Sequence, residues 1–222
     1  MSGRREQNAL HERDARGVHR FTLNTPLKFN VLSEAMLTAL QQGLDAVAAD
    51  EQARVVVIGA AGKAFCAGHD LKQMRSKPEH DYYRDLFSRC SRVMQGVLAL
   101  PVPVIARVQG LATAAGCQLV ATCDMAVATE STRFAVSGIN VGLFCSTPMV
   151  ALTRNVPRKQ AFEMLTTGEF LPAPGAPAAV AESQESSVLI RLSPRSAHPS
   201  TVHSDRAPGS PARSPPPLSR WP

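Results

Sequence analysis

Apolar residues follow two alternating periods along the first 170 residues of the chain. Val18–Leu23 alternates apolar and polar side chains, which predicts a half-buried strand. From Ser33, a candidate N-cap, apolar side chains recur every three or four residues to about Ala49, which predicts an amphipathic helix. The run VVVIGA at Val55–Ala60 is rich in β-branched residues and is typical of a strand buried on both faces.

The same alternation continues towards the middle of the chain. Apolar positions at helical spacing predict a second amphipathic helix over 82–98, and PVPVIARV at 101–108 predicts another buried strand. Strands that alternate with helices in this order need crossover connections and favour a parallel sheet. The sequence therefore predicts an α/β fold.

Three further segments extend this pattern. The small apolar run LATAAGCQLVATCD, at 111–124, predicts a helix packed closely against its neighbours, and MAVAT at Met125–Thr129 predicts one more strand. Arg158–Thr167 predicts a short helix closed by Gly168 at its C-cap. Periodicity stops after Phe170.

Composition divides the chain into three parts. With 222 residues, 44% of them hydrophobic and 19% charged, the chain can bury a core, yet 11 of its 17 prolines lie between Pro172 and Pro222. We predict a flexible N-terminus at 1–16, one globular domain at 17–171 and a disordered Pro/Ser/Arg-rich tail at 172–222. VLIRL, at 188–192, is the one apolar stretch of the tail.

Charge and cysteine usage exclude several classes of protein. The net charge is +6, but the basic residues are scattered among acids, so we predict no nucleic-acid partner. The five cysteines form no C-x-x-C pair, which argues against a disulfide framework or a metal site and favours buried free thiols. No apolar run reaches the length that spans a membrane. The N-terminal segment lacks the apolar centre of a signal peptide, and its acidic residues make it a poor match to a mitochondrial transit peptide.

Two loops contain small residues between a strand and a helix. One is FCAGHDL, with Ala67 and Gly68, and the other holds Ala114, Ala115 and Gly116. Small side chains let a ligand approach backbone N–H groups, which can stabilise an oxyanion on a polarised carbonyl. The alternative is that these residues only permit tight helix packing.

Taken together, the two loops resemble those of the crotonase (enoyl-CoA hydratase/isomerase) superfamily. IARVQGLATAAGCQLVATCDM, at 105–125, is similar to the signature of that family, and GKAFCAGHDL to its other hallmark. NTPLKFNVLS is similar to the opening loop of family members, whose basic residue lies near coenzyme A. The resemblance covers the chain from about Val18 to Phe170.

The resemblance implies a spiral of ββα repeats that binds acyl-CoA thioesters, with the C-terminal helical part of the fold replaced here by the tail. It implies that backbone N–H groups of Ala67 and Ala115 form an oxyanion hole and that coenzyme A enters as part of the substrate, without a further cofactor. The residues that it assigns to substrate binding are Lys28, Gly68, His69, Asp70 and Leu71. We expect His69 to line the pocket, a catalytic imidazolium being the alternative, and Asp70 to cap the following turn.

The sequence departs from the family at both of its catalytic glutamates. Gln118 occupies the first position and Gly138 the second, and neither can take up or release a proton near neutral pH. Cys117, Cys145 and Ser146 are nucleophile-type residues without a base beside them in sequence, so we assign no catalytic residue. Ordinary hydration of enoyl-CoA is therefore not expected.

Three hypotheses for the function follow. The first is an acyl-CoA-binding protein of fatty-acid metabolism without ordinary hydratase activity. The second is an active enzyme of the superfamily, such as an isomerase, thioesterase or decarboxylase, and the third is a non-enzymatic protein that binds partners through its Pro-rich tail. The resemblance also implies mitochondrial localisation and a homo-oligomer, although the tail replaces the helices with which family members build their interface.

Overall fold

The computed structural model describes residues 7–173 and 187–191, and its centre is a six-stranded sheet. The strand order is β1-β2-β3-β4-β6-β9, with parallel pairing from β2 to β6 and antiparallel pairing at both edges. The strands are β1 (Ala9–Arg13), β2 (Val18–Leu23), β3 (Val55–Ala60), β4 (Val104–Val108), β6 (Met125–Thr129) and β9 (Ser187–Arg191).

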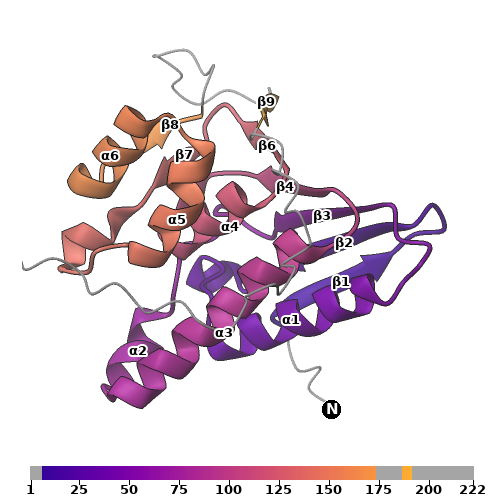
Figure 1. Ribbon diagram of the computed structural model, residues 1–222, viewed down its shortest axis with the longest axis horizontal. Coiled ribbons are helices and arrows are strands. Elements are labelled where there is room, and N and C mark those ends of the chain that lie inside the picture. Colours follow the sequence, from indigo (N-terminus) through magenta and orange to yellow (C-terminus); the bar gives the residue numbers. More distant parts are fainter. Residues whose placement is uncertain (1–6, 174–186, 192–222) are drawn as a thin grey trace, which may run out of the picture.

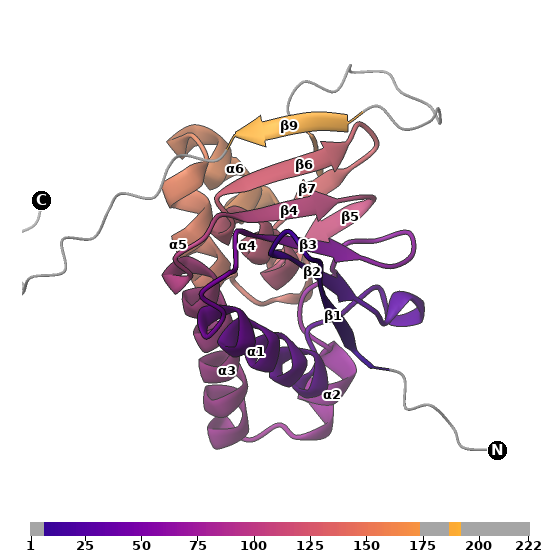
Figure 2. The same cartoon turned by 90° about the vertical axis from the view of Figure 1, so that its right-hand side faces the viewer.

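Two long helices, α1 (Glu34–Ala48) and α3 (His80–Ala99), pack against each other and cover one face of this sheet (Figure 2). The Ser33 side chain accepts the Met36 backbone N–H and so caps α1, as the sequence predicts. Buried side chains of both helices and of the central strands form the main hydrophobic core.

A second, three-stranded sheet lies beside the first and contains β5 (Leu111–Thr113), β7 (Arg133–Ala135) and β8 (Leu171–Pro172). Single-residue bridges join Leu32 to His69 and Cys66 to Ala112, so short extended segments follow β2 and β3 before the next α-helix, as β5 follows β4 before α4. The remaining helices are α2 (Leu71–Ser76), α4 (Ala115–Thr122), α5 (Ser146–Asn155) and α6 (Arg158–Thr167), with two 3₁₀ helices, η1 (Pro26–Lys28) and η2 (Ser137–Val141). Figure 1 shows α4, α5 and α6 grouped beside β7 and β8.

The predicted α/β architecture and most of the predicted elements are confirmed. The predicted helix at 111–124 is wrong for its first part, because Leu111–Thr113 pairs with β7 before the chain turns at Ala114 and α4 begins. The flexible N-terminus predicted at 1–16 is also wrong for Ala9–Arg13, which forms β1. This segment has too few apolar positions to predict a strand, but pairing with β2 provides hydrogen bonds to its backbone.

The predicted tail at 172–222 falls for most of its length outside the described residues. Two parts of it are described and differ from the prediction. Pro172 ends β8 and Ala173 is buried, while Ser187–Arg191 pairs with β6 over five residues as β9. Among the described residues, no helix is long and apolar enough to cross a membrane.

Candidate functional site

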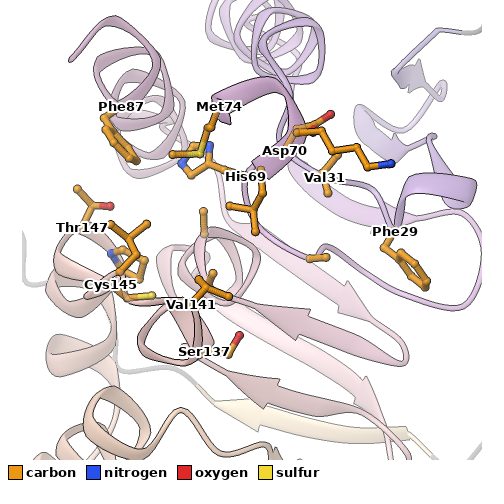
Figure 3. Close-up of a pocket in the computed structure, with 18 of the residues that line it drawn as sticks. Phe29, Val31, His69, Asp70, Met74, Phe87, Ser137, Val141, Cys145 and Thr147 are labelled. Atoms are coloured by element: carbon orange, nitrogen blue, oxygen red, sulfur yellow. The ribbon is translucent and has the colours of Figure 1, made fainter. Parts of the chain in front are cut away.

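A cavity of about 770 Å³ opens where five segments far apart in the sequence meet. These segments are the η1 loop, α2 with the loop that leads into it, α3 at Phe87, the start of α4 and the stretch from η2 to the start of α5. In Figure 3, Met74, His69 and Phe87 lie on one side of the cavity, and Val141, Cys145 and Thr147 lie on the other. Most of the wall is apolar.

The loop before α2 approaches the start of α4 very closely at Gly68. The φ of Gly68 is +89°, and a β-carbon there would lie 2.9 Å from the Ala114 β-carbon and 3.4 Å from the Ala115 nitrogen. Glycine is required both by this backbone conformation and by the lack of space. Gly68 does not itself line the cavity, so its role in substrate binding is corrected to one of bringing the two loops together.

The turn before α4 places a backbone N–H at the cavity wall. Ala114 is the N-cap, with φ +50° and ψ −123°, and Ala115 is the first residue of the helix. An N–H in this position has no partner within its own helix and lies at the positive end of the helix dipole. Gly116 follows, and a β-carbon there would collide with the Cys66 carbonyl oxygen. The absence of a side chain at Gly116 therefore allows the start of α4 to pack directly against the loop that contains Cys66.

The expected oxyanion donor at Ala67 is corrected by the structure. Its N–H donates to the Phe29 carbonyl oxygen at 3.0 Å and is therefore already used. Ala67 lines the cavity, but the residue whose N–H is available on this loop is His69, for which no acceptor is found among the described residues. The Ala115 N–H likewise has no acceptor within the described part of the chain. His69 and Ala115 are thus the two candidate donors, both at the cavity wall.

The His69 side chain lines the cavity and packs edge-on against the Phe87 ring, with 5.3 Å between ring centroids. Its ring nitrogens are shielded from solvent and make no hydrogen bond of good geometry with the described residues. Burial lowers the pKa of His69, an effect that the Leu32 backbone partly opposes. The imidazole is therefore neutral at physiological pH, which fits the predicted pocket-lining role better than an imidazolium.

Charge at the cavity is mainly positive. Lys28, predicted from the opening loop, lines it together with Lys72, and Asp70 is the one carboxylate among the lining residues. The Asp70 carboxylate accepts the Gln73 backbone N–H at 3.1 Å and caps α2, as predicted. Leu71, the first residue of that helix, also lines the cavity.

The two positions at which the resemblance implies glutamates differ in their surroundings. Gly138 lines the cavity, but a β-carbon there would lie 2.6 Å from the Cys145 sulfur and closer still to the Leu143 carbonyl oxygen. Gln118 is buried within α4 and does not reach the cavity wall, and its side-chain oxygen has no hydrogen-bond partner among the described residues. Neither position presents an acid to the cavity.

The thiols considered as nucleophiles are buried. Burial raises the pKa of Cys117 to about 12 and also raises the pKa of Cys145, whose sulfur fills the space beside Gly138. A thiol with a raised pKa is a poor nucleophile near neutral pH. Ser146 follows Cys145 as the first residue of α5 and lines the cavity, without a hydrogen-bonded base among the described residues.

Sequence reasoning missed several residues that shape the site. Phe87 comes from the middle of α3, and Ser137 and Val141 come from η2, for which the sequence carries no clear signal. Asn30 is fully buried at φ +53°, and its side chain bonds to the Thr25 N–H and to the carbonyls of Ala61 and Ala64. It thereby ties the η1 loop to the loop after β3. An isolated Asn beside a Phe gives no indication of this role in the sequence.

Comparisons with known proteins identify the family of the chain. The family described as Enoyl-CoA hydratase/isomerase matches residues 13–179. The chain belongs to the enoyl-CoA hydratase/isomerase family. The structure accordingly has a crotonase-like α/β fold, and within the described residues no three His, Cys, Asp or Glu side chains come together as metal ligands.

Two relatives carry the name enoyl-CoA hydratase domain-containing protein 3, mitochondrial. The Xenopus laevis protein is 52% identical over 157 residues, covering 71% of this chain and 53% of its own length. The human protein is 49% identical over 174 residues, covering 78% of this chain and 57% of its own length. The chain thus spans a little over half the length of these relatives.

Solved structures of the family superpose on the chain. An enoyl-CoA hydratase from Mycobacterium smegmatis gives a TM-score of 0.75 at 65% identity, covering 76% of this chain and 65% of that chain. Human enoyl coenzyme A hydratase domain-containing protein 3 gives 0.73 at 50% identity, covering 76% of this chain and 66% of that chain. The crotonase-like fold predicted from the motifs is therefore confirmed.

Proposed function

We propose that the chain binds acyl-CoA thioesters in this cavity and does not hydrate enoyl-CoA by the two-glutamate mechanism of its family. The observation that carries the proposal is the pair of unengaged backbone N–H groups, of His69 and Ala115, on loops in contact at Gly68. Two N–H donors that converge on one carbonyl oxygen polarise it and stabilise negative charge there. A thioester carbonyl matches this arrangement.

The rest of the cavity suits the two ends of such a ligand. Lys28 and Lys72 at the wall provide positive charge for the phosphates of coenzyme A. Apolar side chains, including Met74, Phe87 and Val141, line the part that would receive the acyl chain. Coenzyme A would enter as part of the substrate, and the proposal requires no separate cofactor.

The absence of hydration follows from the chemistry of the wall. Hydration needs one group to activate water and one to protonate the α-carbon, each within hydrogen-bond reach. Asp70 is the one carboxylate among the described residues that line the cavity; its Oδ1 accepts the capping N–H of α2, and no second carboxylate lies at the wall to share the two proton transfers. In this setting the free N–H groups would bind and polarise a thioester without completing the reaction. By analogy with the relatives named mitochondrial, we place this function in mitochondria, and the proposed acyl-CoA ligand assigns it to fatty-acid metabolism.

Calorimetric titration with acetyl-CoA and with octanoyl-CoA tests the binding. The informative variant is Ala115→Pro, because proline removes the N–H and places a ring carbon where that hydrogen pointed. Proline is accepted at the first position of a helix, but Ala114 at φ +50° lies outside the backbone region preferred before proline, so the fold of this variant is measured alongside its binding. Arg158→Pro is the matched control, since Arg158 is the first residue of α6 and does not line the cavity. Removing one of two donors should weaken binding about tenfold in Ala115→Pro and leave Arg158→Pro unchanged.

Two results would contradict the proposal. One is folded wild-type protein that binds neither thioester. The other is hydration of crotonyl-CoA well above the uncatalysed rate, which would instead support an active enzyme of the family. Circular dichroism of each variant verifies that a loss of binding is not a loss of folding.

A further inference from the structure

A pair of hydrogen-bonded hydroxyl groups joins the wall of the cavity, at Ser137, to the buried Thr113 side chain. Thr113 is the last residue of β5 and Ser137 the first of η2, and their side-chain oxygens are 2.7 Å apart. Thr113 is buried, with 6% of its surface exposed, whereas Ser137 is partly buried and lines the cavity (Figure 3). The proposed thioester binding makes no use of either hydroxyl.

Burial decides which of the two hydroxyls donates. Each hydroxyl has one proton to give and can accept two hydrogen bonds. Within the described residues, Ser137 is the one hydrogen-bond partner of the Thr113 side-chain oxygen. If Ser137 donated, the Thr113 proton would be buried without an acceptor, which is costly. Thr113 therefore donates to Ser137, and the Ser137 proton remains available to the cavity.

Strand pairing places this proton near the proposed thioester site. Thr113 pairs with Ala135 in the parallel β5–β7 ladder, and the next N–H, from Ala114, donates to the Ala135 carbonyl at 3.0 Å. Ser137 follows Ala135 by two residues, and Ala115 follows Ala114 directly. The hydroxyl of Ser137 and the N–H of Ala115 therefore lie on adjacent segments and line the same cavity.

We propose that Ser137, held in place by Thr113, is a specificity-determining residue that selects acyl groups carrying an oxygen close to the thioester carbonyl. This inference rests on the proposed binding of acyl-CoA. A hydroxyl or keto oxygen on the acyl chain accepts the Ser137 proton, whereas an unsubstituted chain leaves that donor unsatisfied in a largely apolar cavity. The predicted ligand class is thus the 3-oxygenated acyl-CoA thioesters, in preference to saturated ones of the same length.

Calorimetric titration of the full chain with 3-hydroxybutyryl-CoA and with butyryl-CoA measures this preference. One hydrogen bond corresponds to about five- to tenfold tighter binding of the hydroxylated ligand. Ser137→Ala should abolish the preference: 3-hydroxybutyryl-CoA loses its hydrogen bond, and butyryl-CoA binds at least as tightly as to the wild type, because the unsatisfied donor is gone. Thr113→Val keeps the Ser137 hydroxyl but removes the group that orients it, so the preference should decrease.

Ser146→Ala is the matched control, because it removes a hydroxyl from another part of the same wall, and no threonine among the described residues is hydrogen-bonded to that hydroxyl. It should retain the full preference. Equal binding of the two ligands by wild-type protein would overturn this inference and leave the proposed function intact. Equal weakening of both ligands by Ser137→Ala would also overturn it, because the hydroxyl would then contact the thioester common to both. Binding of neither ligand would reject the proposed function itself.

Discussion

Replacement of Gly138 tests whether the chain can regain the missing acid of its family. The site lies at the cavity wall, so Gly138→Glu would be the obvious attempt to restore a catalytic carboxylate. A β-carbon there would lie 2.6 Å from the Cys145 sulfur, about 0.4 Å inside the 3.0 Å limit for such contacts, and would also meet the Leu143 carbonyl oxygen. Backbone oxygen cannot swing away as a flexible side chain can. Even Gly138→Ala must therefore displace the segment between η2 and α5.

Overpacking of this kind costs about 1–3 kcal/mol. For a domain of this size, that loss lowers the melting temperature by roughly 3–9 °C. Gly59→Ala is the matched control: Gly59 lies in β3, and a β-carbon there would be 3.3 Å from the flexible Arg107 side chain. We expect this control to lose clearly less stability than Gly138→Ala, because the flexible Arg107 side chain can move at little cost.

Differential scanning fluorimetry measures the stability of these variants, and a crotonyl-CoA absorbance assay measures hydration by Gly138→Glu. We expect a clear loss of stability and no hydration, because the new side chain enters by displacing the cavity wall and Gln118 supplies no partner acid. Wild-type stability of Gly138→Ala would show that the site has room. Efficient hydration by Gly138→Glu would show that one restored acid is enough, and either result would refute the reasoning.

Two further predictions concern stability. Burial and the neighbouring His19 lower the pKa of His11 in the folded protein. The unfolded chain, whose histidines have a pKa near 6.5, therefore binds a proton at this residue more readily than the folded chain does. The free energy of unfolding, measured with urea, should therefore fall between pH 7.5 and pH 5.5, and it should fall less in His11→Phe. The same pH dependence in His11→Phe and in the wild type would contradict this explanation. Asp70→Ala should lose about 1 kcal/mol with the cap of α2, or about 3 °C in melting temperature, and Asp70→Asn should retain most of it. Equal melting of the two Asp70 variants would contradict the capping role.

The elements that sequence predicts correctly are those whose signals are local. The cap at Ser33 and the helical spacing behind it define α1, and the β-branched run at Val55–Ala60 defines β3. The helix Arg158–Thr167 ends where Gly168 adopts φ +66°, as its C-cap position predicts. Each of these signals lies within one element and needs no distant partner.

The errors occur where distant segments decide the structure. Leu111–Thr113 forms a strand because β7 lies beside it, although its small apolar residues favour a helix. The Ala67 N–H is occupied by the Phe29 carbonyl, from a loop almost forty residues earlier in the chain. No pattern around Ala67 indicates this hydrogen bond. The available donor is therefore two residues further along, at His69.

The sequence by itself determined the α/β class and the two small-residue loops, because residue types and short spacings encode these features directly. The tertiary structure alone decided which backbone N–H groups remain free, that Gly138 has no room for a side chain, and that Thr113 supports Ser137. These facts depend on contacts between segments that are separated in sequence. Hydrogen-bond satisfaction and close packing are settled only when those segments meet.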